Sequence, residues 1–429
     1  MNAVSQTSLQ ASAQGFLARY EGLKDRLSGN AGQRKAGADA FARHGLPGPR
    51  EEAWRYTPLR SLAEIPFHEP VRLLGDTPRL AFIDDQLAAL ALPDTPRLVF
   101  IDGNFRADLS VLPTGVTTTT TGAPAFGRIA DNAEKLVALN TMLAEDGAAI
   151  DVPPGVDAGT IALISLGSDA NGTPVSFHPR HAIRLGAGAR LTLVETNAGT
   201  GVYFNNPVLT AEIAEDAILV HLRMQLESEG AFHLSTVLAE VGARGTYDSF
   251  SLALGGRLAR VEVHATLMGE KSAAHLNAAQ LLGGSQHSDF TTIVRHAAPA
   301  TASRQTVKNV LTGRSKGVFQ GKIEVARIAQ KTDGYQMNQT LLLSRDAEID
   351  SKPQLEIYAD DVKCSHGATV GELDADQLFY LRSRGVPAEQ ARNLLVRAFL
   401  SEALDPIAHE GVRNAMEAAI AAWWEKQPG

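Results

Sequence analysis

The stretch GGRLARVEVHATLMGEKSAAHLNAAQLLG (residues 255–283) decides the fold of this chain. It holds two apolar, strand-like runs, and its turn glycines recur every fourteen residues: Gly255, Gly269 and Gly283. Two earlier turn centres, Gly188 and Asp216, lie twenty-eight residues apart. Strand, turn, strand and turn therefore form a coil of about 28 residues, and a period in this range is typical of a solenoid.

Short apolar strands of this kind fill residues 126–371, apart from a helix expected over 131–147. One coil cannot cover its own apolar face, so the neighbouring coil must cover it. We therefore predict a mainly β protein with helical ends, whose core is a right-handed, parallel-type β-helix (solenoid). The alternative is a β-sandwich, in which strands recur every 8–12 residues or so. A spacing of fourteen residues is long for a sandwich and favours the solenoid.

The stretch QKTDGYQMNQTLLLS (330–344) is rich in amide side chains: Gln330, Gln336, Asn338 and Gln339. Stacked coils accept amide ladders that pair along the stack, so the solenoid accounts for these residues. A polar loop is the other interpretation that the sequence allows.

The N-terminal flank, residues 1–125, mixes helical and strand patterns. Apolar residues recur at helical spacing over 12–29 and 32–45, and each of these segments ends at a glycine. The run at 97–103 is typical of a buried strand that enters a turn. We expect this flank to form a mixed, mostly helical domain.

The C-terminal flank, residues 372–429, is helical throughout. Helix starts are expected near Asp374, at Pro387 and at Asp405. The last of these helices ends in the pair Trp423–Trp424. Such a pair more often closes a core than docks a partner, although tryptophan is enriched at interaction hot spots.

Composition excludes several classes of protein. The chain is 44% hydrophobic and 21% charged, as soluble globular proteins are. A net charge of −8 argues against a nucleic-acid partner, which requires a basic surface. No apolar run is long enough to span a membrane, and the start lacks the basic and apolar blocks of a secretory signal. A single cysteine cannot form an internal disulfide. We therefore expect a cytoplasmic protein.

Familiar catalytic motifs are missing from the sequence. It contains no G-x-x-x-x-G-K-[ST] phosphate loop, no G-x-S-x-G and no H-E-x-x-H, so we expect no nucleotide hydrolysis by this chain. His287 and Asp289 would share one face of a strand. Two ligands fall short of a metal site, so we expect a surface or inter-coil hydrogen bond there.

The single cysteine, Cys364, lies two positions before His366, so both side chains project from the same face of one strand. Periodicity alone favours an inward-facing thiol and a core histidine. However, this strand is the last before the C-terminal helices, where the stack ends and an apolar face is left uncovered. If a second protein covers that end, the thiol and the imidazole face an interface, and both are suitable ligands for iron.

The segment 303–385 closely resembles the core of the SufB/SufD iron–sulfur (Fe–S) cluster assembly scaffolds. DDVKCSHGATVG (360–371) followed by LFYLRSRG (378–385) is specific and is similar to the SufD branch. Further matching stretches spread the resemblance over most of the chain: EEAWRYTPL (51–59), LVFIDGNF (98–105), LNTMLAEDG (139–147) and GGSQHSD (283–289). SufB proteins carry additional cysteines, including the one thought to accept sulfur, and this chain lacks them. The resemblance thus implies the partner subunit and not the sulfur acceptor.

What the resemblance implies is a non-catalytic scaffold subunit. It would form a heterodimer with a SufB-like subunit through the C-terminal part of the solenoid, and would bind a SufC-like ATPase through its C-terminal helices (386–429). The motif match places His366 in the interfacial site as a ligand of iron or of a transient Fe–S cluster, with Cys364 as an accessory position. No cofactor is expected on the isolated chain, which could form a homodimer through its uncovered end.

Two other functions stay open at this point. A polysaccharide-processing β-helix enzyme would use paired carboxylates in a groove. The adjacent pair Asp360–Asp361 would point to opposite faces of a strand, and a turn explains it equally well. A purely structural solenoid that only presents surfaces is the third hypothesis.

Overall fold

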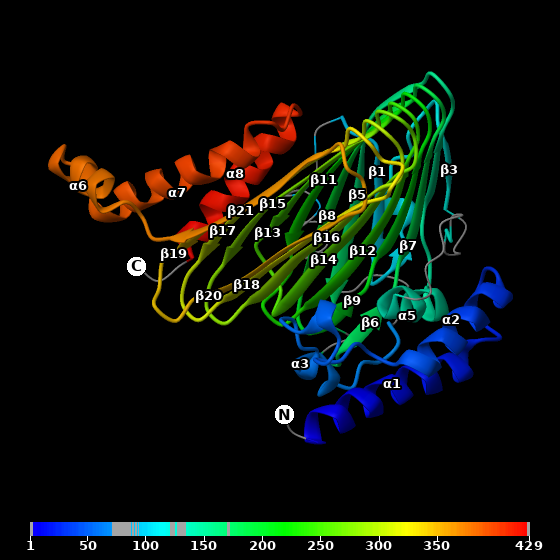
Figure 1. The fold of residues 1–429 in the computed structure, drawn as a ribbon. Coiled ribbons are helices and arrows are strands. Elements are labelled where there is room, and N and C mark those ends of the chain that lie inside the picture. The colour runs from blue at the N-terminus through cyan, green and yellow to red at the C-terminus, as the bar shows by residue number, and fades with distance from the viewer. Residues whose placement is uncertain are drawn as a thin grey trace.

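The computed structural model describes residues 3–70, 94–120, 134–169 and 172–426, together with residues 87, 90, 92, 125 and 126. Within these residues the chain is a β-solenoid with helices at both ends, as predicted (Figure 1). The helices are α1 (Ala3–Leu23), α2 (Ala31–His44), α3 (Arg60–Ala63), α5 (Lys135–Leu143), α6 (Ala375–Ser383), α7 (Ala388–Leu404) and α8 (Glu410–Glu425), with short 3-10 turns at Glu52–Trp54 and Ala107–Leu109.

Two sheets form the walls of the solenoid. The ten-stranded sheet has, in order, β2 (Asn104–Phe105), β1 (Arg97–Ile101), β5 (Asp157–Ser168), β8 (Arg190–Thr200), β11 (Ile218–Leu226), β13 (Thr246–Ala253), β15 (Ala273–Leu282), β17 (Ala302–Leu311), β19 (Asp333–Leu342) and β21 (Lys363–Gly371). The eleven-stranded sheet has β20 (Glu348–Ile357), β18 (Lys316–Val325), β16 (His287–His296), β14 (Leu258–Leu267), β12 (Phe232–Val241), β10 (Val208–Ile213), β7 (Arg180–Leu185), β4 (Ala149–Val152) and β3 (Thr117–Thr119), with β6 (Val175–Phe177) and β9 (Tyr203–Asn205) beside this path.

Successive coils pair in parallel. Ile218 lies beside Thr246 of the next coil, so the period of about 28 residues is confirmed at this point. The only antiparallel pairs among the described strands are β1 with β2 and β3 with β4, both at the N-terminal end of the stack. The sandwich alternative is therefore wrong, because a sandwich would pair its strands antiparallel.

One column of turns stacks through left-handed residues. Its members, spaced like the coils, all have positive φ: Gly155, Gly188, Asp216, Arg244, Lys271, Ala300 and Lys331. Each donates its backbone N–H to a carbonyl in the turn of the next coil, as Gly188 does to Glu215 (2.8 Å). The predicted turns at Gly188 and Asp216 are members of this column, which joins the coils outside the strands.

The helices cover the outer faces of the two sheets on opposite sides (Figure 1). α1, α2 and α5 pack with Phe204, Phe232 and Leu258 on the eleven-stranded sheet. α7 and α8 pack on the ten-stranded sheet, against residues such as Leu252 and Leu281. The predicted helices over 12–29, 32–45 and 131–147 correspond to α1, α2 and α5, and residues 131–133 of the last lie outside the described residues.

Candidate functional site at the last coil

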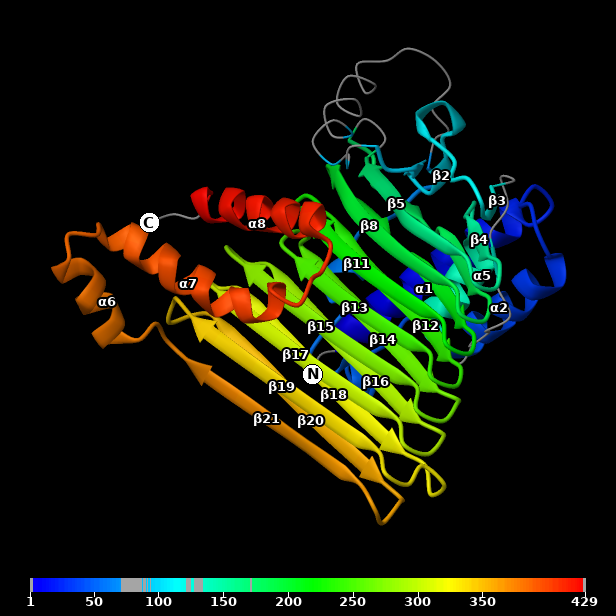
Figure 2. The same ribbon diagram turned by 90° about the horizontal axis from the view of Figure 1, so that it is seen from above.

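The last coil consists of β20 and β21, each of which ends one sheet (Figure 2). β20 pairs only with β18 and β21 only with β19, so one edge of each strand carries unpaired backbone groups. Neither strand has a buried residue: most of β20 is half-buried and most of β21 is exposed, whereas β18 and β19, one coil earlier, both contain buried residues. Within the described chain, the stack is thus open at this end.

Cys364 lies near the start of β21 and points toward the inside of the solenoid. It continues a column of inward residues in which Ser303 and Gly334 precede it, both buried. Its thiol is half-buried and accepts a hydrogen bond from the Gly334 backbone N–H. Burial raises the pKa of the Cys364 thiol above its ordinary value, and the nearby charge of Asp333 adds to this effect. Without a metal, the sulfur is therefore protonated at neutral pH.

His366 follows on the same face of β21, below the buried Gln336 of β19. Its side chain is exposed, because no further coil covers it. Among the described residues, no hydrogen bond engages its ring. The strand arrangement thus brings the two predicted site residues to one open face.

A charged rim borders the thiol. Arg304 and Asp333 form an ion pair across adjacent coils (2.7 Å), and Lys363 lies in the same shallow hollow as Cys364. Tyr335 and Ser365 complete the lining of this hollow. A polypeptide that covers Cys364 must therefore also accommodate these charges.

On the side of the ten-stranded sheet, the interior beneath the last coil is polar. Gln280 donates to Asn309 (2.9 Å), which donates to Asn338 (2.7 Å), so three successive coils form an amide ladder. Asn338 confirms the ladder prediction. The prediction is wrong for Gln330, whose side chain bonds to backbone groups of a turn, and for Gln339, which accepts a hydrogen bond from Lys308.

His287 and Asp289 form hydrogen bonds, as predicted. Asp289 is fully buried and accepts from Arg260 of the preceding coil (2.6 Å), while His287 lies 3.2 Å from the Thr57 hydroxyl. Asp289 also accepts from the Thr57 hydroxyl, and Arg260 lies over the Trp54 ring, so these residues fasten the N-terminal segment around Trp54 to the outer face of the sheet. Neither residue belongs to the group of three or more metal-ligating side chains found in the described part of the chain.

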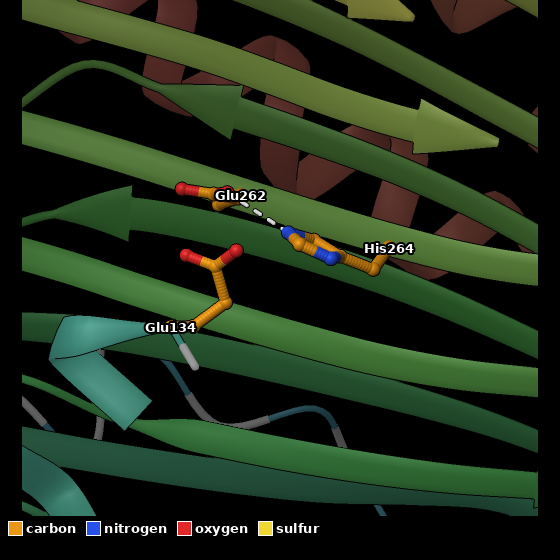
Figure 3. Close-up of side chains that lie close together, drawn as sticks. All are labelled: Glu134, Glu262 and His264. Carbon is orange, nitrogen blue, oxygen red and sulfur yellow. Dashed lines mark hydrogen bonds and ion pairs between the residues drawn. The ribbon is translucent and has the colours of Figure 1, made fainter. Parts of the chain in front are cut away.

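That group was not predicted from the sequence. Glu134 precedes α5, and Glu262 and His264 lie two positions apart on β14 (Figure 3). The Glu-x-His spacing was a usable signal, since alternate residues share a strand face. Glu134 carried no such signal, because only the fold brings it to β14.

The C-terminal helices divide their aromatic residues between core and surface. Trp423 is buried with Leu400 and Ile420, so it closes a core as expected, and Trp424 is half-buried. In contrast, α6 has no buried residue and exposes Phe379 and Tyr380 (72% and 58% of their surface). The pair Asp360–Asp361 is exposed in the turn between β20 and β21. Among the described residues, no helix has the length and apolarity to cross a membrane.

Fold and site define a class: β-solenoid proteins with helices on both outer faces, whose last coil presents a thiol and an imidazole at an open edge. The chain belongs to the SufBD family, since the family model described as "SUF system FeS cluster assembly, SufBD core domain" matches residues 167–399.

Relatives agree with this assignment. The chain is 34% identical to the iron-sulfur cluster assembly protein SufD of Escherichia coli (strain K12), over 88% of this chain and 89% of that protein. It is 31% identical to the SufBD family protein slr0076 of Synechocystis, over 91% and 90%. It is 32% identical to the chloroplastic protein ABCI7 of Arabidopsis thaliana, over 66% and 62%. The family resemblance inferred from the sequence is confirmed.

Proposed function

We propose that this chain is a non-catalytic scaffold subunit of an ATPase-driven, SufBCD-type Fe–S cluster assembly complex, and that His366 and Cys364 are ligands at its interface with a SufB-like subunit. One observation carries the proposal: the solenoid ends in a coil that no further coil of the described chain covers, and both proposed ligands lie on it. The SufD name of a relative at 34% identity supports the same role.

The chemistry of the two side chains supports an iron-side role. The imidazole of His366 is exposed, so a metal can reach it, and imidazole and thiolate both suit iron. The raised pKa of Cys364 means that its sulfur coordinates only when a metal displaces the proton. His366 is therefore the main ligand and Cys364 the accessory one. The iron or transient cluster is cargo, held between two subunits.

The open edges of β20 and β21 support the choice of interface. Exposed strand edges pair readily with another chain, and a SufB-like solenoid would cover both strands at once. In the absence of that partner, a second copy of this chain would occupy the same edges as a homodimer.

The C-terminal helices are the proposed dock for a SufC-like ATPase. α7 uses one face to pack on the ten-stranded sheet and leaves Leu394 49% exposed on the other. Beside it, the exposed Phe379 and Tyr380 of α6 add an aromatic surface of the kind enriched at hot spots. We therefore extend the proposed docking surface from residues 386–429 to include α6 as well. Such a complex would act in the cytoplasm.

The test of the interfacial site is co-expression with SufB- and SufC-like partners, followed by measurement of iron and acid-labile sulfide in the purified complex. His366→Ala should reduce cluster content at least tenfold while the complex still elutes as one species. Thr369→Ala, an exposed residue on the opposite face of β21, is the matched control and should retain wild-type content. An intact His366→Ala complex with normal iron and sulfide would exclude the ligand role.

The dock is tested separately by ATPase co-purification. Deleting 386–429 would uncover the apolar sheet beneath α7 and α8, so a point change is sharper. Leu394→Ser should weaken ATPase recovery strongly without lowering the thermal midpoint, and Val111→Ser, equally exposed and remote from α7, should not. Full ATPase recovery with Leu394→Ser would place the dock elsewhere.

A further inference from the structure

We propose a second metal site, distant from the last coil, in which Glu134, Glu262 and His264 bind one divalent cation of the Zn²⁺ or Fe²⁺ class (Figure 3). The site lies where the start of α5 meets the outer face of β14. It does not depend on the function proposed for His366.

Three ligand atoms converge there. One ligand atom from each residue lies within 4.8 Å of the other two. Glu262 Oε1 accepts a hydrogen bond from His264 Nε2 (2.8 Å), and a metal would take the place of that proton. Two ligands at 2.0–2.2 Å from a metal are separated by roughly 3 Å, so this pair is already close to a coordination edge. The imidazole supplies its Nε2 lone pair when its single proton is on Nδ1.

A neighbouring arginine orients the central ligand. Arg260 donates from Nε (3.0 Å) and Nη2 (2.9 Å) to Glu262 Oε2. This bifurcated contact fixes the carboxylate and leaves Oε1 turned toward His264. Groups of this kind, which hold a ligand from behind, are a regular feature of metal sites.

The local charge favours a dication. Arg260, a buried cation in contact with the group, is shared between Glu262 (2.9 Å) and Asp289 (2.6 Å). The carboxylates of Glu134 and Glu262 bring two negative charges to one partly buried place, and Glu262 is only 8% exposed. A dication placed between these two carboxylates would be attracted by both.

The ligand set selects the class of metal. One imidazole nitrogen and two carboxylate oxygens suit Zn²⁺, Fe²⁺ and Mn²⁺ better than the all-oxygen cations Ca²⁺ and Mg²⁺. In register with His264, the neighbouring strands carry Leu238 and Ile293, so apolar side chains border the imidazole. A bound ion would fasten the start of α5 to the solenoid wall.

The experiment uses the full chain with Cys364→Ala and His366→Ala, so that the last coil cannot contribute ligands. Zn²⁺ binding is measured by equilibrium dialysis with elemental analysis, and the thermal midpoint is followed with and without Zn²⁺. We expect one equivalent of Zn²⁺ and a higher midpoint with the ion. Glu134→Gln and His264→Gln, which keep size and hydrogen-bonding capacity, should each weaken binding at least tenfold and abolish the rise.

Glu240→Gln is the matched control, since Glu240 is exposed on the same outer face of the sheet, on β12. It should bind Zn²⁺ as the parent chain does. The proposal is overturned if the parent chain binds no Zn²⁺, or if either glutamine variant at positions 134 and 264 binds it as tightly as the parent.

Discussion

The buried ion pair between Arg260 and Asp289 should be among the largest single contributions to the attachment of the N-terminal segment. Both side chains are almost fully buried, with 1% and 0% of their surface exposed. Asp289 accepts hydrogen bonds from Arg260 (2.6 Å), from the Thr57 hydroxyl and from Thr291 (2.8 Å). The perturbation is Asp289→Asn, which keeps the shape of the side chain and removes its charge.

Breaking one partner of a buried pair costs about 3–5 kcal/mol, because the remaining charge stays buried. In Asp289→Asn, Glu262 still contacts Arg260 and the amide oxygen still accepts a hydrogen bond. We therefore expect a loss of about 3 kcal/mol in the free energy of unfolding, at the low end of that range. Asp216→Asn removes the charge from an inter-coil pair with Arg244, whose side chains are 53% and 49% exposed. A pair so exposed contributes little to stability, because water and salt screen it.

The assay is urea unfolding followed by tryptophan fluorescence. Trp54 is a direct reporter, since the Arg260 guanidinium lies 4.0 Å from its ring centre. Repeating the measurement in 1 M salt should remove the effect of Asp216→Asn and leave that of Asp289→Asn, because salt screens exposed pairs only. Equal losses in the two variants would refute the claim that burial decides the strength of the pair.

Four further variants test the packing and the charges of the chain. Gly186→Ala places a Cβ 2.5 Å from the Pro154 nitrogen and should cost about 1–3 kcal/mol in urea unfolding, whereas Gly15→Ala in α1 meets no atom within 4 Å and should gain about 0.5–1 kcal/mol. Asn309→Ala removes the middle of the amide ladder, so the Asn338 amide oxygen loses its donor and Gln280 keeps only its bond to the Val318 carbonyl; a calorimetric midpoint should fall by an amount equivalent to about 1–3 kcal/mol. Burial raises the pKa of Glu145 to about 7, although its arginine partner opposes this, so the folded state holds this proton more tightly than the unfolded one. The stability that the protonated Glu145 carboxyl contributes is therefore full below about pH 4.5 and is lost as the pH rises through 7. Because glutamine stays neutral, the free energy of unfolding of Glu145→Gln should rise relative to that of wild type between pH 5 and 7.5. A difference between the two proteins that does not change with pH would contradict the raised pKa of Glu145.

Much of the fold could be predicted because several turn residues recur with the period of the coil. A left-handed turn favours glycine or aspartate, and Gly188 and Asp216 therefore marked two members of the turn column. Arg244 and Lys331 occupy equivalent positions with φ of 56° and 61°, and no local preference marks them. At these two positions the stacked turns impose the left-handed backbone conformation. The sequence therefore shows the coil period only at turn positions that hold a residue favouring that conformation.

The site was predictable only where its residues are neighbours in one strand. Cys364 and His366 share a face by simple alternation, and their place in the last strand followed from the helices that come after it. The periodicity of the strand favoured burial of both side chains, so it could not predict their exposure. Their exposure depends on whether another strand pairs with the free edge of β21, which is a property of the whole stack. The proximity of Glu134 to β14 could not be predicted either, because the two are more than a hundred residues apart in the sequence and only the fold brings them together.

The composition of the inner columns explains why this end of the solenoid tolerates being open. The column that ends at the thiol reads, coil by coil, Leu191, Leu219, Tyr247, Ala274, Ser303, Gly334 and Cys364. Large apolar residues fill the middle of the stack, and small or polar ones replace them toward β21. A terminal coil lined by leucine would expose a contiguous apolar patch and aggregate. Around Cys364 the terminal coil is therefore polar enough to stay hydrated alone, while Ile357 and Val370 of the same coil leave apolar surface exposed for a partner to cover. Polar groups at the thiol with apolar contacts beside them are what a ligand site shared between two subunits requires.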